Sequence, residues 1–247
     1  MKVVIQAGHI NCQYNIDSGI RKSTGSPGEQ ELTKRIADKV SSMLRERKFE
    51  VVQTDANANS DASITGKDFD LFLALHGDAD APNDQGGGMI GSGDSSVDMS
   101  WKRSKEIATI MKGVYFKESG IIDKNFVTNG MTKYYMWKYL SYKTPCVLLE
   151  MGQTQDAHDK VLLANTFLIA SSIVRSICKV FNIPYDLPST TIDSKDQKIL
   201  DLQSSLDKAN ATLIQANKDS AAAMAVKEIE CQGLKSKLKQ ISILSTL

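Results

Sequence analysis

The 247-residue sequence has no large excess of either charge, few cysteines and no long apolar run. Thirty Lys and Arg residues oppose 29 Asp and Glu, so the formal net charge is +1. A balance this even gives no long-range field that favours nucleic acid or an anionic membrane as a partner. No run of about eighteen apolar residues occurs, and no membrane span is predicted. The scattered spacing of the four cysteines, Cys12, Cys146, Cys178 and Cys231, predicts reduced thiols and no disulfide framework.

The amino end also lacks the features of a secretory signal. Met1 leads almost directly into a strand-like run, without an apolar stretch followed by a small-residue cleavage site. We therefore expect synthesis to be completed in the cytoplasm.

Residues 1–181 alternate short β-branched runs with amphipathic stretches. This alternation is typical of an α/β fold, with a twisted, mostly parallel sheet flanked by helices. Strands are expected at Lys2–Gln6, Glu50–Thr54, Leu71–Leu75, Gly88–Ile90 and Cys146–Leu149. One helix is expected where Leu32, Ile36, Val40 and Met43 recur at helical spacing, and others over Ser100–Lys112, Met131–Tyr142 and His158–Phe181.

The composition changes after residue 181. Residues 182–195 contain two prolines and several small polar residues, which predicts a linker. Residues 196–247 are polar and helix-favouring and contain no aromatic residue. An apolar seam in steps of three and four runs along Ile199, Leu202, Leu206, Ala209, Leu213 and Ala216. We therefore expect a helical, coiled-coil tail that self-associates, with a register that fails near Lys227 and Glu230. The alternative is a largely disordered extension that contributes little to catalysis.

Three strand-like runs each finish on a residue capable of metal binding or acid–base chemistry. VVIQAG leads to His9, LFLAL to His76 and CVLL to Glu150. In open α/β sheets, ligands bind at the carboxyl ends of the strands, so these three side chains converge if their strands are neighbours. Each histidine taken singly is equally compatible with an ordinary residue at the end of a strand.

Glu29 is a candidate fourth member of this group. It lies three residues before Leu32 and seven before Ile36, on the face of its helix that turns toward the sheet. Glu31 instead aligns with the polar Arg35 and Asp38. A first-turn acid also stabilises a helix dipole, which is the alternative reading of Glu29.

Two histidines and one glutamate form the three-ligand set of a catalytic zinc site with one open position. His9, Glu29 and His76 are therefore the candidate ligands for Zn²⁺, and Glu150 is left as the candidate base. Cys12, three residues after His9, would close the site as a fourth ligand, and no second cysteine accompanies it. His158 is expected to be a surface or capping residue. The aromatic pair Tyr134-Tyr135 suits either the core or contact with a glycan.

The order and spacing of these motifs resemble the zinc-dependent N-acetylmuramoyl-L-alanine amidases of type 3. The resemblance covers about residues 1–181 and depends on the Gly8-His9 pair, Glu29 followed by Ile36-Ala37, "DLFLALHGDA" around His76 and "VLLEMG" around Glu150. The family usually has an acidic residue where this chain has Gln6.

The resemblance implies hydrolysis of the amide bond between N-acetylmuramic acid and L-alanine in peptidoglycan. Together with the missing signal, it suggests a phage endolysin-like enzyme that acts on the cell wall after release. The residue types alone imply only metal-assisted amide hydrolysis. A zinc peptidase cutting within the stem peptide would use the same ligands and base, and a non-enzymatic wall-binding or scaffold protein is the alternative from another class.

Overall fold

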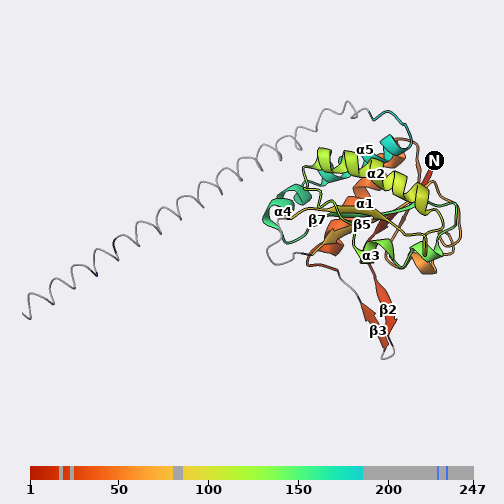
Figure 1. The fold of residues 1–247 in the computed structure, drawn as a ribbon, viewed down its shortest axis with the longest axis horizontal. Coiled ribbons are helices and arrows are strands. Elements are labelled where there is room, and N and C mark those ends of the chain that lie inside the picture. Colours follow the sequence, from red (N-terminus) through yellow and green to blue (C-terminus); the bar gives the residue numbers. More distant parts are fainter. Residues whose placement is uncertain (17–18, 23–24, 80–85, 186–226, 228–231, 233–247) are drawn as a thin grey trace, which may run out of the picture. The chain divides into compact units, whose positions relative to one another are not determined.

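A five-stranded sheet with the order β4-β1-β5-β7-β6 positions the rest of the chain (Figure 1). The computed structural model describes residues 1–16, 19–22, 25–79, 86–185, 227 and 232. The strands are β1 (Lys2–Ala7), β4 (Glu50–Thr54), β5 (Leu71–Asp78), β6 (Met89–Ser92) and β7 (Cys146–Gln153). β1 pairs in parallel with β4 and β5, β5 pairs in parallel with β7, and only the edge strand β6 is antiparallel. The expected α/β class and mostly parallel sheet are confirmed.

Three long helices cover one face of this sheet (Figure 1). They are α1 (Glu29–Glu46), α2 (Trp101–Ser119) and α5 (Thr166–Val180). Alternate strand residues such as Val3, Leu73 and Leu149 point into this layer, where they meet the apolar face of α1. A strand directs successive side chains to opposite faces, so the residues between them point to the other side of the sheet.

The other face of the sheet is covered mainly by short helical turns and irregular segments. Phe72 and Leu148 pack there against Ala58 in η1 (Ala58–Ser60) and against Trp137 in η2 (Trp137–Tyr139). The prediction of one continuous helix over Met131–Tyr142 is wrong, because this covering segment is mostly irregular.

Residues 129–142 contain only α3 (Asn129–Thr132) and the η2 turn. Met131, Met136 and Trp137 are all buried, a spacing of five and then one that no single helix face presents. The Trp137 indole donates a hydrogen bond to the Met131 carbonyl at 2.9 Å and closes the segment on itself.

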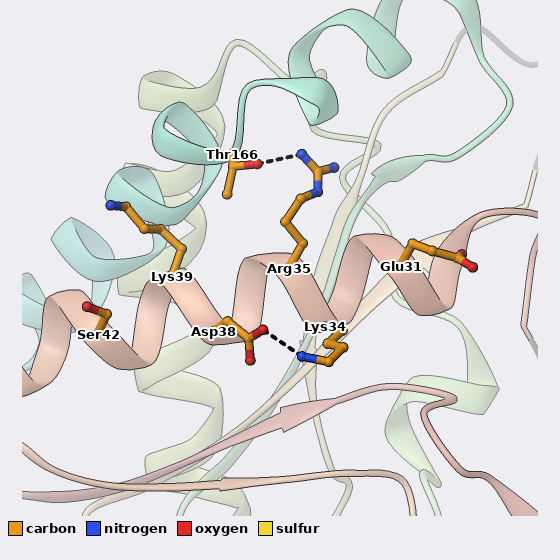
Figure 2. A pocket seen from close by; sticks show the side chains of 7 residues that line it. All are labelled: Glu31, Lys34, Arg35, Asp38, Lys39, Ser42 and Thr166. Carbon is orange, nitrogen blue, oxygen red and sulfur yellow. Dashed lines mark hydrogen bonds and ion pairs between the residues drawn. The ribbon is translucent and has the colours of Figure 1, made fainter. Parts of the chain in front are cut away.

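The helix expected over His158–Phe181 is divided in two. α4 (Ala157–Ala164) is followed directly by Asn165. The Asn165 side chain accepts a hydrogen bond from Leu168 N at 3.0 Å and caps α5. Arg35 on α1 donates to the Ala164 carbonyl at 3.0 Å and to the Thr166 hydroxyl, and so holds this break (Figure 2). Asparagine is a favoured N-cap, which explains why the chain restarts a helix there.

Two regions of residues 1–185 depart from the expected order of elements. A two-stranded hairpin, β2 (Gln13–Ile16) and β3 (Gly19–Lys22), projects between the first strand and α1 (Figure 1). The first residues of the expected linker, including Ile183 and Tyr185, pack against the hydrophobic core, and the compact unit extends to Tyr185. The coiled-coil tail predicted over 196–247 falls almost entirely outside the described residues.

Within the described part of the chain, no single helix is long and apolar enough to cross a membrane. Only α4 and α5 taken together meet the length and composition, and they bend by 80° at their junction.

Ile36 tests the packing of α1 on the sheet. Its side chain is fully buried, and we expect Ile36→Ala to lower the free energy of unfolding by about 2–5 kcal/mol through lost apolar contact and a residual cavity. The exposed Ser42 on the same helix is the control, because Ser42→Ala should change it by less than about 0.5 kcal/mol. Chemical denaturation of the two variants measures the difference, and equal stabilities would contradict this packing of α1.

Candidate metal centre

The pairing of β5 with β7 brings His76 and Glu150 side by side. They are direct register partners on adjacent parallel strands, so both side chains leave the same face of the sheet. Both strands continue past these residues, to Asp78 and to Gln153. His76 and Glu150 therefore lie inside their strands, close to the carboxyl ends. The sequence had instead suggested that each residue directly follows the end of its strand.

His9 follows β1 in a left-handed backbone conformation with φ of 58°. This conformation is uncommon for a residue with a side chain, and neighbouring bonds hold it in place. Thr33 Oγ1 on α1 donates to the Gly8 carbonyl at 2.8 Å, and Gln30 Nε2 donates to the His9 carbonyl at 2.7 Å. Gly8 itself is required for close packing, because a Cβ atom there would lie 2.5 Å from His76 Cε1.

Glu29 is the first residue of α1, and its side chain is 3% exposed. One carboxylate oxygen, Oε2, accepts hydrogen bonds from Ser26 N at 2.7 Å and from Ser26 Oγ at 3.2 Å. The other, Oε1, accepts from Gly77 N at 3.0 Å. Glu31 lies on the exposed outer side of the helix near Arg35 (Figure 2). The choice of Glu29 as the inward acid is consistent with this placement.

His9, Glu29 and His76 bring three potential ligand atoms to one point, all within 4.8 Å of one another. Glu29 Oε1 lies 3.1 Å from His76 Nδ1 and 3.6 Å from His9 Nε2. Tetrahedral zinc with bonds of about 2.0–2.2 Å separates its ligand atoms by about 3.3–3.6 Å. The residue types and their spacing therefore fit a divalent metal ion with imidazole and carboxylate ligands.

The charges in this cluster are coupled. Burial opposes ionisation of Glu29, but hydrogen bonds from His76 and Gly77 outweigh it, and the pKa of Glu29 is lowered. Burial likewise opposes protonation of His76, yet the bond to Glu29 and the negative charges of Glu150 and Glu29 raise the pKa of His76. A positive charge is thus favoured at this point, whether it is a proton or a metal ion.

Glu150 has the features of a carboxyl group ready for proton transfer. Burial raises its pKa to about 7, with the positive charge of His76 opposing and the negative charge of Glu29 adding to the shift. Its Oε2 atom is buried and accepts no hydrogen bond. A carboxyl group in such an environment can both accept and return a proton near neutral pH.

The other candidates from the sequence lie outside this cluster. Cys12 does not contribute a ligand atom to the group formed by His9, Glu29 and His76. His158 sits in a second group with Asp156 and Asp159 at the start of α4. His158 is exposed there, as expected of a surface residue, while the residue that caps the helix is Asp156, which accepts from the backbone N–H groups of His158 and Asp159.

Sequence reasoning named Gln6 and Tyr134 but missed that they are hydrogen-bonded to each other on the far side of His76. Tyr134 Oη lies 3.2 Å from His76 Nε2 and donates to Gln6 Oε1 at 3.0 Å. Gln6 is fully buried at the end of β1. A buried glutamine in an otherwise apolar strand was the one signal of this network, because a buried amide needs hydrogen-bond partners.

Comparison with known proteins supports one assignment for this arrangement. Residues 3–179 match the family Amidase_3, N-acetylmuramoyl-L-alanine amidase. No curated protein has a sequence that matches the chain significantly.

Several solved structures share the fold. The catalytic domain of the amidase CwlV from Bacillus (Paenibacillus) polymyxa var. colistinus is 21% identical, with a TM-score of 0.51 over 74% of this chain and 99% of that one. The catalytic domain of the CD27L endolysin, which targets Clostridia difficile, is 18% identical, with a TM-score of 0.54 over 75% of this chain and 99% of its own. Ami1 from Mycobacterium smegmatis is 16% identical, with a TM-score of 0.53 and coverages of 74% and 97%.

The family match runs from Val3 in β1 to Lys179 in α5 and includes every residue of the candidate metal centre. The chain therefore belongs to the N-acetylmuramoyl-L-alanine amidase family, and its activity is hydrolysis of peptidoglycan at the amide bond that the family name describes.

Proposed function

We propose that the amidase activity depends on a zinc ion held by His9, Glu29 and His76, with Glu150 as the general base. The observation that carries this proposal is the convergence of the three ligand atoms around Glu29 Oε1, beside Glu150, which is the register partner of His76 on the next strand. The family is zinc-dependent, and two imidazoles with one carboxylate form a ligand set that suits zinc. When bound, Zn²⁺ supplies a Lewis acid that polarises the amide carbonyl and lowers the pKa of water at the open position.

The protein's own groups then perform the proton transfers. Glu150 takes a proton from the attacking water as the water oxygen bonds to the carbonyl carbon of the lactyl group. The protonated Glu150 passes this proton to the nitrogen of L-alanine, which leaves as an amine when the C–N bond breaks. Burial raises the pKa of Glu150 to about 7, so near neutral pH the carboxylate and carboxylic acid forms are similarly populated. The group can therefore accept a proton in the first step and return it in the second.

The three ligands are tested together by metal content. We expect His9→Ala, Glu29→Ala and His76→Ala each to lower the zinc bound per chain, because each removes one of only three protein ligands. Glu31→Ala, on the exposed face of the same helix as Glu29, should retain the wild-type zinc content. Elemental analysis of the purified variants after dialysis decides, and full zinc in Glu29→Ala would exclude Glu29 as a ligand.

The role of Glu150 is tested by Glu150→Gln, which keeps the shape of the side chain and removes the base. We expect normal zinc content and a loss of activity of about a hundredfold or more. The rate is measured as new amino-terminal L-alanine released from purified peptidoglycan. This product also separates the amidase from a peptidase, which frees a different amino group.

The matched control for that experiment is Glu31→Gln, a change of the same kind at an exposed position. It should hydrolyse peptidoglycan at the wild-type rate. Near-normal turnover in Glu150→Gln would show that Glu150 is not the base.

We also propose that residues 196–247 join copies of the chain. The support is the apolar seam from Ile199 to Ala216. A helix with such a seam is stabilised in water when the seam is buried against another helix. Light scattering at micromolar concentration should find a larger species for the full chain than for a chain ending at Ser194. A monomeric full chain would contradict self-association.

A further inference from the structure

A chain of hydrogen bonds leads from the candidate metal ligand His76 into the end of β1. His76 Nε2 lies 3.2 Å from Tyr134 Oη, and Tyr134 Oη donates to Gln6 Oε1 at 3.0 Å. On the opposite side of the imidazole ring, Nδ1 lies 3.1 Å from Glu29 Oε1. The two ring nitrogens of His76 thus face two different environments, a metal position and a tyrosine hydroxyl.

Backbone carbonyl groups at the far end of this series of hydrogen bonds determine which group donates and which accepts in each bond. The Gln6 amide donates from Nε2 to the Asp55 carbonyl at 3.0 Å and to Tyr135 Oη at 3.3 Å. Tyr135 in turn donates its only hydroxyl proton to the Ala56 carbonyl. Carbonyl oxygens accept and never donate, so the NH₂ group of Gln6 must face Asp55 and its oxygen must face Tyr134.

This orientation leaves one choice for the proton on Tyr134. A hydroxyl has a single proton, and Gln6 Oε1 can only accept one. Tyr134 therefore donates to Gln6 and offers an oxygen lone pair to His76. His76 Nε2 must then carry the hydrogen of that bond. In the protonated ring Nδ1 also donates to Glu29 Oε1, and when a metal ion takes the place of that proton, Nδ1 offers its lone pair to the ion.

Burial makes this arrangement costly to break. Gln6 is fully buried, so an unpaired amide there would lose its hydrogen bonds without gaining water. The Tyr134 ring packs edge-on against His76, with ring centroids 5.4 Å apart, and against Trp137 at 5.1 Å.

We propose that Tyr134 and Gln6 are positioning residues that hold His76 in the tautomer protonated at Nε2, with Nδ1 ready to bind the metal. The inference rests on the proposed function, because it assumes that His76 is a zinc ligand. It adds residues outside the ligand set that tune metal affinity through their hydrogen bonds to His76 and to each other. Partners of this kind orient ligating histidines, and their loss commonly weakens metal binding about 10–100-fold.

The first test measures the zinc dissociation constant of the full chain by competition with a chelator. Tyr134→Phe keeps the ring and removes the hydroxyl, and we expect zinc binding about tenfold weaker or more. Tyr139→Phe is the matched control, since Tyr139 is a partly buried tyrosine five positions away and outside this chain of bonds. It should bind zinc as the wild type does, and thermal melting of both variants confirms that they are folded.

The second test separates a relay through Tyr134 from simple packing. Gln6→Met keeps the length of the side chain and removes the acceptor, so the Tyr134 proton is free to turn toward His76 Nε2 and favour the wrong tautomer. We expect zinc affinity to fall about tenfold in Gln6→Met. In a Tyr134→Phe background the same change should have no further effect beyond about twofold. Losses that add fully in the double variant would overturn the relay.

The third test observes the tautomer directly in the zinc-loaded wild type. The chain contains only three histidines, so ¹⁵N NMR of histidine-labelled protein resolves the ring nitrogens individually. We expect a slowly exchanging proton on His76 Nε2, and its loss to solvent exchange in Tyr134→Phe. A proton on Nδ1 would overturn the proposal.

The outcomes distinguish this inference from the proposed function. If the wild type binds zinc and His76→Ala does not, but Tyr134→Phe keeps wild-type affinity, only the positioning role fails. If the wild type does not bind zinc, or binds it equally in His76→Ala, the metal assignment fails and the positioning role fails with it.

Discussion

The buried carboxylate of Glu29, facing two imidazole rings, is the constraint on which the rest of the site depends. Three lone-pair-bearing atoms meet within 4.8 Å of one another, and two of the three residues are almost excluded from solvent. An ionised carboxylate is stable in such a place only when a positive charge and hydrogen bonds compensate for lost hydration. Gly77 N and Ser26 supply part of this compensation, and the imidazoles of His76 and His9 supply another part.

The parallel sheet provides the geometry that this constraint requires. β1, β5 and β7 are consecutive in the sheet order, so the residues near their carboxyl ends lie on one edge. His76 and Glu150 are register partners, and β1 delivers His9 and Gln6 next to them. Helix α1 then packs its apolar face on the sheet, and the same face carries Glu29 inward. Stability of the core and convergence of the three candidate ligands therefore depend on the same packing of α1 against the sheet.

The segment between α3 and β7 shows why local pattern was insufficient for part of the site. Its aromatic and apolar residues suggested an amphipathic helix, but the chain runs irregularly over the sheet. This path lets Tyr134 and Tyr135 reach the strand ends. There both tyrosines form hydrogen bonds with Gln6, and Tyr135 also donates to the Ala56 carbonyl after β4. The hydrogen bonds to these groups join residues 79 to 129 positions apart, and no local propensity encodes such pairing.

Much of the fold and of the candidate site was readable from the sequence alone. The strand runs, the helix that carries Ile36, and the motifs around His9, Glu29, His76 and Glu150 all follow from apolar periodicity and from residue chemistry at strand ends, which are local properties.

Only the tertiary structure decided which side chains meet. It divided the final helix at Asn165, replaced an expected helix by irregular chain, and brought Tyr134 to His76. These outcomes depend on satisfying buried polar groups across the sheet. Such groups find their partners only after the strands have paired, so the spacing of residues along one segment does not reveal them.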